Sequence, residues 1–171
     1  MHARISTLSI ALILTAYGCG SSSPTASSPT TLTASPPVSD WTVTQRFVSV
    51  SGPDNCWVRE QRQRLTGAVF SDLPMTVTRS AGAIRLEGSF FDVNYTGTMN
   101  GSEFSASGGP LAGGGRACQD GTSFQQLAGV SNLSGRFSAD DRSMTASEVN
   151  SYRLSSGEPV TYTWEWQAAR K

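Results

Sequence analysis

Apolar and polar residues alternate with a period of two along most of the chain beyond residue 40. The first run places Trp41, Val43 and Phe47 on one face and ends near Val50. Short alternating runs separated by Gly, Asn, Asp and Ser are typical of antiparallel strands joined by tight turns. The pattern predicts eight or nine strands, in the segments 41–50, 73–77, 84–90, 91–99, 104–106, 124–127, 133–137, 144–154 and 160–166.

Four features interrupt this alternation. Asn100-Gly101 favours a type I′ hairpin turn, because that turn needs two residues that accept positive φ. The glycine-rich stretch 108–115 predicts a loop, and no Lys-Ser/Thr pair follows it to make a phosphate site. Residues 53–65 are expected to form one short helix, with Ser51 as capping residue and Gly67 just past the end. An alternating pattern at Cys56-Trp57-Val58 is the alternative for this segment. A change of apolar parity between Phe90 and Phe91 indicates a bulge or bend.

Aromatic residues near both ends of this region suggest that the sheet closes on itself. Closure would bring Trp41 near Trp164 and Trp166 and would remove the exposed strand edges. The predicted fold class is therefore all-β: an antiparallel up-and-down meander closing into an eight- to nine-stranded barrel, with one helix. A β-sandwich is the alternative, since period two alone does not distinguish closed from stacked sheets.

The first 39 residues differ from the rest in composition. Arg4 precedes a short apolar run, 5–14, which is too short to span a bilayer and predicts a cleaved export signal over residues 1–18. The stretch Ala16-Tyr17-Gly18-Cys19 resembles the lipobox of bacterial lipoproteins, and this resemblance implies that Cys19 is acylated and anchors the chain to a membrane. Gly20 after the cysteine favours the outer membrane by analogy with lipoprotein sorting. Residues 19–39 then form a lipidated disordered tether, and residues 40–171 form the folded domain.

Charge and residue types exclude several functions. The formal net charge of the 171-residue chain is zero, with no basic run, so nucleic-acid binding is not expected. The single histidine, His2, would leave with the signal, so Ser-His-Asp and Cys-His catalysis and most zinc sites are not expected either. Hydrolysis by two facing carboxylates is the remaining catalytic chemistry. We expect a non-catalytic protein without a cofactor.

Two cysteines remain in the folded domain. With Cys19 acylated, Cys56 and Cys118 form the one available pair, and export to an oxidising compartment favours a disulfide between them. This disulfide would join the predicted helix to the glycine-rich segment.

The order of elements resembles the small lipocalin-like, or calycin-like, barrels of bacterial lipoproteins. The segments that carry the resemblance are the hairpins 95–104 and 134–145, within a span from Trp41 to Trp166. The resemblance implies a barrel whose mouth holds a small apolar or amphipathic ligand. An alternative is an envelope structural or interaction protein, or an enzyme inhibitor, that acts through its surface on a protein partner that the sequence does not identify.

The candidate binding residues lie on the last two predicted strands. If Met144 points inward, strict alternation turns Glu148, Asn150 and Tyr152 inward as well. A buried carboxylate needs a partner. Arg46 or a ligand could supply it, or a bulge near Val149 could turn Glu148 outward. Three further aromatic residues could form a ligand-binding wall or simply pack in the core, and they are Tyr162, Trp164 and Trp166.

Overall fold

The computed structural model describes residues 37–88, 94–118 and 120–171. The predicted signal, Cys19, the tether as far as residue 36 and the predicted bulge between Phe90 and Phe91 lie outside these residues. The first strand begins at Val38, so Val38 and Ser39, which the composition assigned to the tether, already pair with a neighbouring strand.

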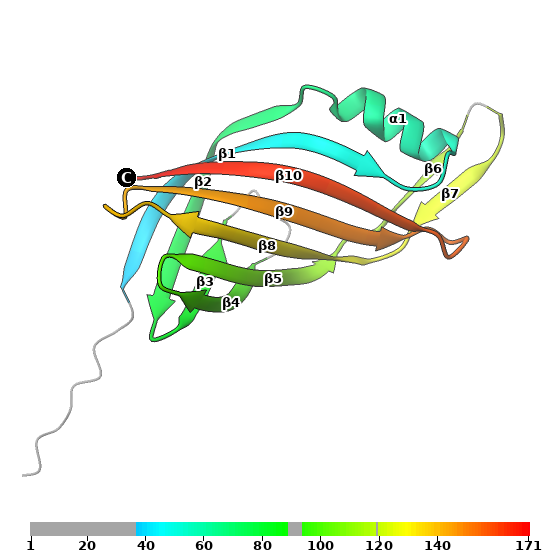
Figure 1. Ribbon diagram of the computed structural model, residues 1–171. Helices are drawn as coiled ribbons and strands as arrows, with labels where there is room; N and C mark the ends of the chain where they lie inside the picture. Colours follow the sequence, from blue (N-terminus) through cyan, green and yellow to red (C-terminus); the bar gives the residue numbers. More distant parts are fainter. Residues whose placement is uncertain (1–36, 89–93, 119) are drawn as a thin grey trace, which may run out of the picture. The chain divides into compact units, whose positions relative to one another are not determined.

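Eight antiparallel strands close into a barrel in the order β1-β10-β9-β8-β5-β4-β3-β2, as predicted (Figure 1). The two remaining strands, β6 and β7, form a separate hairpin beside one end of the barrel. In the described residues no helix has the length and apolar character needed to cross a membrane. The elements are β1 (Val38–Ser51), α1 (Cys56–Leu65), β2 (Val69–Ser80), β3 (Ala83–Glu87), β4 (Tyr95–Asn100), β5 (Glu103–Leu111), β6 (Gly114–Ala117), β7 (Ser123–Gln126), β8 (Gly129–Phe137), β9 (Ser143–Arg153) and β10 (Pro159–Arg170).

Closure is made by the first and last strands, but its aromatic contacts differ from the expected ones. Because β1 and β10 run antiparallel, Trp41 at the start of β1 pairs with Arg170 at the end of β10, and Phe47 pairs with Trp164. The rings of Phe47 and Trp164 lie 5.2 Å apart in edge contact, whereas the Trp41 ring meets Phe137 at 5.5 Å. Phe47 therefore occupies the place that the sequence analysis gave to Trp41.

The predicted helix is confirmed, and it begins later than residue 53. Ser51 still pairs with Thr161 in the β1–β10 ladder, so it cannot cap a helix. Asn55 takes that role: its backbone is extended, and its side chain accepts a hydrogen bond of 3.0 Å from the backbone N–H of Val58. Gly67 follows the helix with φ of 79°, a conformation that favours glycine.

Two predictions about turns need correction. Asn100 pairs with Glu103, so the turn residues are Gly101 and Ser102, and of these only Gly101 has positive φ. That pattern belongs to a type II′ turn rather than to type I′. The glycine-rich stretch is mostly strand, since β5 continues to Leu111 and β6 begins at residue 114. The register of β5 with β8 shifts between residues 108 and 111, and Gly109 lies at this shift with φ of 150°. Such a shift cannot be predicted from an alternating pattern.

Large side chains fill the barrel interior at the end away from α1, which we call the filled half. Trp41, with no exposed surface, packs there with buried Phe104, Phe137 and Met144. The end of this half carries the ion pairs of Asp141 with Arg79 and Arg170. The other half of the interior, beneath α1 and the β6–β7 hairpin, is not filled in this way.

Candidate functional site

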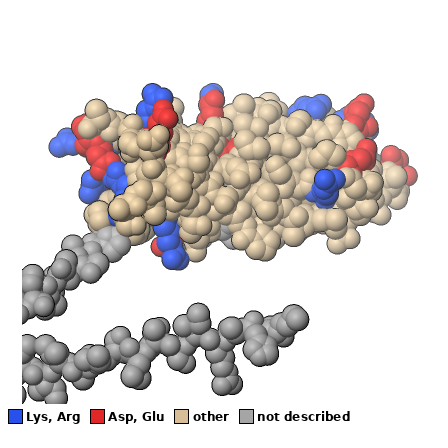
Figure 2. Space-filling model, turned by 60° about the horizontal axis from the view of Figure 1, so that its bottom comes forward, with Lys and Arg blue, Asp and Glu red and all other residues tan. Residues whose placement is uncertain are grey.

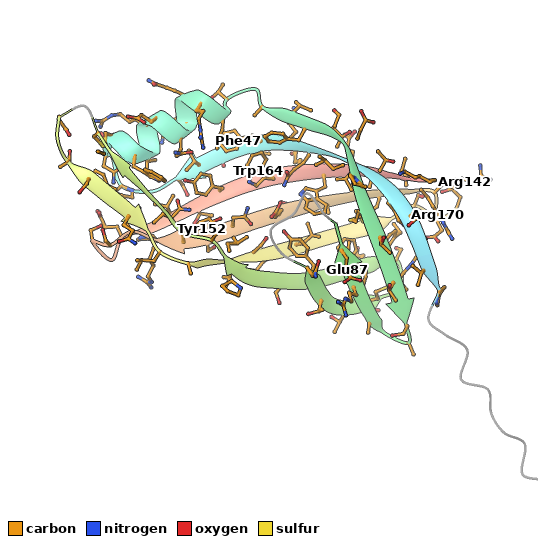
Figure 3. The ribbon with its side chains drawn as sticks, turned by 180° about the vertical axis from the view of Figure 1, so that it is seen from behind. Phe47, Glu87, Arg142, Tyr152, Trp164 and Arg170 are labelled. Carbon is orange, nitrogen blue, oxygen red and sulfur yellow. A yellow bond between two sulfur atoms is a disulfide. The ribbon has the colours of Figure 1, made fainter. Side chains whose placement is uncertain are left out.

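A cavity of about 600 Å³ occupies the half of the barrel covered by α1, which we call the cavity half. Figure 3 shows Phe47, Trp164 and Tyr152 on the three neighbouring strands β1, β10 and β9 in this half. The cavity is bounded by α1, by the ends of several barrel strands and by the start of β6. Its lining comprises Gln45, Trp57, Gln61, Arg64, Leu65, Phe70, Tyr95, Leu111, Ala112, Gly113, Gly114, Gly115, Gln126, Glu148, Asn150, Tyr152, Tyr162 and Trp164.

The Cys56–Cys118 disulfide connects two of the elements that bound this cavity. Cys56 opens α1 and Cys118 follows β6, and their Cα atoms lie 6.1 Å apart, within the range of ordinary disulfides. The predicted pairing is confirmed, and it joins the helix on one side of the cavity to the hairpin on the other. Both elements lie outside the barrel ladder, so the disulfide fixes the part of the lining that the sheet does not.

Glu148 lies at the bottom of the cavity and is 3% exposed. One carboxylate oxygen accepts hydrogen bonds from the Tyr95 hydroxyl at 2.6 Å and the Ser131 hydroxyl at 2.9 Å. The other accepts from Gln45 Nε2 at 2.6 Å and Trp166 Nε1 at 2.9 Å. Four donors around one group fit an ionised carboxylate, which only accepts hydrogen bonds.

These four partners are neutral, so none of them balances the charge of Glu148. Burial, and after it the negative charge of Glu148, hold the pKa of Tyr95 well above its ordinary value. Tyr95 therefore stays protonated and continues to donate at neutral pH. The cluster of Glu148 with Gln45, Tyr95, Ser131 and Trp166, which we call the polar floor, separates the filled half from the cavity half.

Tyrosine and tryptophan side chains make up much of the cavity wall. Tyr162 donates a hydrogen bond of 3.1 Å to the Gln126 side chain, and its ring meets Tyr152 edge-on at 5.7 Å. Burial raises the pKa of Tyr162, and a weak donor contact from the Trp57 indole and the charge of the Arg64 guanidinium partly offset that rise. The wall is thus largely aromatic, and the raised pKa values of Tyr95 and Tyr162 keep these two hydroxyl groups protonated at neutral pH.

Two polar atoms of the cavity lining have no hydrogen-bond partner among the described residues. One is the donor Nε1 of Trp57, a residue that is 8% exposed, and the other is the acceptor Oδ1 of Asn150. Trp57 Nε1 faces the Tyr162 hydroxyl closely enough to lower the pKa of Tyr162 as a weak donor, but the contact does not reach the geometry of a full hydrogen bond. Buried polar atoms are rarely left unpaired, so this donor and this acceptor mark places where a bound molecule or water would be held.

The structure gathers five of the six predicted binding residues in this cavity, namely Glu148, Asn150, Tyr152, Tyr162 and Trp164. Trp166, the sixth, faces the interior but lies in the polar floor, 1% exposed, and does not line the cavity.

The observed partners of Glu148 also differ from the expected one, Arg46. Arg46 is not that partner, because it alternates outward and binds Glu165 at the surface. The register of β9 with β10 runs unbroken from residue 143 to 153, so a bulge near Val149 is excluded as well.

The neutral residues that hold Glu148 were not among the predicted site residues, although two of them have a recognisable signal in the sequence. Gln45 occupies an inward position between Val43 and Phe47, and Ser131 has the same parity as Leu133 in its strand. A polar residue at an inward position is the recognisable feature in both cases. Gln61 and Gln126, which also line the cavity, gave no such signal, because neither lies within a regular barrel strand.

A larger groove of about 810 Å³ lies on the outer side of β4, β5, β8, β9 and β10. Its rim carries short polar side chains and the exposed ion pair of Arg136 with Glu103. None of the buried unpaired polar atoms of the described residues lines this groove. Figure 2 shows, on the face it presents, charged side chains mostly toward the two ends of the barrel and uncharged residues between them. We therefore place the candidate site inside the barrel.

The cavity lining offers aromatic faces, one buried carboxylate and several neutral polar groups. Glu148 is the only carboxylate among the lining residues that the structure describes, so these residues do not supply the facing pair that glycoside hydrolysis requires. No group of three His, Cys, Asp or Glu suited to a metal ion occurs within residues 37–88, 94–118 and 120–171. Comparisons of the chain with models of known protein families, with curated proteins and with solved structures found no match.

Proposed function

We propose that the protein is a non-catalytic, membrane-anchored lipoprotein that binds a small apolar or amphipathic ligand inside its barrel. The observation that carries this proposal is the pair of unpartnered polar atoms, Trp57 Nε1 and Asn150 Oδ1, in an aromatic cavity of about 600 Å³. Ligand cavities are concave, mainly apolar and carry a few placed polar groups. This cavity combines aromatic side chains with a larger share of polar groups, and its volume suits a molecule of the size of a small drug or metabolite.

The lipid anchor is the second part of the proposal and rests on the lipobox resemblance at Cys19. Acyl chains on this cysteine would hold the barrel at the bacterial cell envelope, on the outer membrane. The wild type, expressed in a bacterial host with its leader, should partition into the detergent phase and carry added acyl mass. A Cys19→Ser variant should partition into the aqueous phase. Wild-type protein without acyl mass would contradict the anchor and would leave the cavity proposal untouched.

Binding is tested with the neutral fluorescent probe N-phenyl-1-naphthylamine. We expect saturable binding at one site, with energy transfer from tryptophan, because Trp57 and Trp164 line the cavity. Phe70→Asp should weaken binding at least tenfold, since Phe70 lines the cavity and its ring lies tilted against that of Trp164, with the centroids 5.9 Å apart. Val130→Asp is the matched control, because Val130 is exposed and lies outside the cavity lining.

Native mass spectrometry of protein purified from its own host tests the same proposal without a chosen probe. A bound small molecule should appear as an added mass that is lost on unfolding. Absence of both this mass and probe binding would contradict the proposal and favour the alternative of a protein that acts through its surface, for which crosslinking should then return a protein partner.

A further inference from the structure

The negative charge of Glu148 in the cavity has no cationic partner, and this limits which chemical class of ligand the cavity favours. Glu148 is nearly fully buried, and its four partners are neutral hydroxyl, amide and indole groups. Hydrogen bonds stabilise the carboxylate but leave its charge in place. In a site of low dielectric that charge acts strongly on whatever enters the cavity.

An unpaired acceptor lies beside this charge. Asn150 follows Glu148 by two residues on β9, so both side chains face the same side of the sheet, and Asn150 Oδ1 has no donor among the described residues. A ligand that satisfies Asn150 must therefore donate a hydrogen bond. On the helix side of the cavity the requirement is reversed, because Trp57 Nε1 needs an acceptor.

The walls suit a cation as well. Aromatic rings with an electron-rich face attract ammonium groups, most strongly where water is excluded. Five elements, α1, β2, β4, β9 and β10, supply six such rings to this lining, and they are Trp57, Phe70, Tyr95, Tyr152, Tyr162 and Trp164.

Arg64 is the one feature that favours an anion, and it is weaker than Glu148. It is the only cation among the lining residues that the structure describes, it is exposed, and it donates to Gln61 at 2.7 Å. Solvent and salt screen an exposed charge far more than a buried one. A carboxylate ligand could meet Arg64 only at the rim, and it would be repelled by Glu148 if it entered further.

We propose that the ligand is a protonated organic amine that also carries an acceptor oxygen. Its N–H group faces Asn150 Oδ1 and the Glu148 end of the cavity, its oxygen accepts from Trp57 Nε1, and its apolar body lies against the aromatic wall. This inference rests on the proposed function, because it assigns the chemistry of the ligand held in the same cavity.

The test compares three compounds that share one apolar body and differ in head group: 3-phenylpropylamine, 3-phenylpropan-1-ol and 3-phenylpropanoate. Each competes with bound N-phenyl-1-naphthylamine at pH 7 on the folded protein. We expect the amine to bind about tenfold more tightly than the alcohol, from the ring faces and the buried carboxylate, and the carboxylate to bind most weakly.

Variants then assign the preference to named atoms. Asn150→Leu should reduce the preference for amine over alcohol at least threefold, and Asn132→Leu, the same change at an exposed position of β8, should leave it unchanged. A compound with an added oxygen, 3-amino-1-phenylpropan-1-ol, should bind more tightly than 3-phenylpropylamine to the wild type but not to Trp57→Phe. These readouts are ratios measured on one protein, so a modest loss of stability does not affect them.

The outcomes separate the two proposals. If the probe binds and the alcohol or the carboxylate competes as well as the amine, or if none of the three competes, the assignment of an amine is overturned and the binding proposal stands. An unchanged preference in Asn150→Leu also overturns the assignment. If the probe itself fails to bind, both proposals fail.

Discussion

The two halves of the barrel interior are built from the same alternating strands, yet one is packed and the other is hollow. In the filled half, large residues such as Trp41 and Phe137 interlock across the barrel. In the cavity half, equally large residues such as Trp164 and Tyr152 stand around a space of about 600 Å³. The polar floor around Glu148 divides them. The contrast teaches that inward-pointing aromatic residues do not by themselves indicate a solid core, and that a polar group at an inward position marks where packing ends.

Truncating a tryptophan in each half gives the largest expected difference. Trp41→Ala should lower the free energy of unfolding by about 4 kcal/mol, because a large cavity replaces a fully enclosed side chain. Trp164→Ala should lower it by about 2 kcal/mol, since Trp164 already borders a cavity and loses fewer contacts. Urea unfolding followed by circular dichroism measures both. Equal losses would contradict the division into two halves.

The disulfide should matter mainly to the cavity half. A bond between residues 62 positions apart stabilises by about 4 kcal/mol at most from chain entropy. Because it joins α1 to the β6–β7 hairpin, a Cys56→Ser/Cys118→Ser double variant should lose hydrogen-exchange protection first in α1, while β1 and β10 stay protected. Uniform loss of protection throughout the barrel would show that the disulfide does not act locally.

The polar floor predicts a specific dependence on pH. The pKa of Tyr95 is raised by burial and by Glu148, so the folded protein holds this proton more tightly than the unfolded chain. The stabilisation is therefore complete below about pH 10 and is lost as the pH rises above it, by up to about 1.4 kcal/mol per pH unit for each such tyrosine.

Tyr95→Phe separates this contribution from that of Tyr162, whose pKa is also raised. The variant should lose about 2 kcal/mol at pH 7, because one donor to a buried carboxylate is gone, and its stability should fall less steeply above pH 10 than that of the wild type. Chemical unfolding between pH 8 and 11 measures both. An identical slope in the two proteins would rule out the assigned role of Tyr95.

Adding a methyl group tests how much room each half leaves. At Gly135 a Cβ atom would lie 2.6 Å from Ala146 Cβ and 2.7 Å from the Phe104 ring, so Gly135→Ala should destabilise by about 1–3 kcal/mol. At Gly114, in the cavity lining, nothing lies within 4 Å, and Gly114→Ala should be tolerated within about 0.5 kcal/mol. Thermal unfolding compares the pair, and a tolerated alanine at Gly135 would count against tight packing in the filled half.

The smallest effect is expected outside both halves. Arg46 forms an exposed ion pair with Glu165 and has no part in holding Glu148. Arg46→Met should change stability by no more than about 0.5 kcal/mol, as exposed pairs usually do. A loss of several kcal/mol, measured in the same unfolding assay, would mean that this arginine supports the buried carboxylate after all.

Much of the fold followed from local pattern alone. Period-two alternation predicted the strands that carry Met75, Leu133 and Tyr162, and the cysteine count predicted the disulfide. The pattern failed where structure depends on distant partners. The ladder opposite Gly129 keeps Leu111 in a strand despite the glycines before it, and pairing with Thr161 keeps Ser51 from capping the helix.

The site was predictable in part for the same reason. The alternation of inward and outward positions along the strand predicted that Glu148, Asn150 and Tyr152 point into the barrel, because side-chain direction in a strand is a local property. Which inward residues line a cavity and which form its floor depends on how strands distant in sequence register. Alternation alone therefore could not show that Trp166 lies in the polar floor and contacts Glu148. The contribution of α1 through Gln61 required knowing where the helix docks.

A crystal structure of the protein with bound N-phenyl-1-naphthylamine tests the central claim most directly. The account predicts density for one probe molecule within the cavity half, between Trp57 and Trp164 and above Glu148, with the filled half unchanged. Probe density only in the outer groove beside Arg136, or an interior packed solid by side chains, would contradict it.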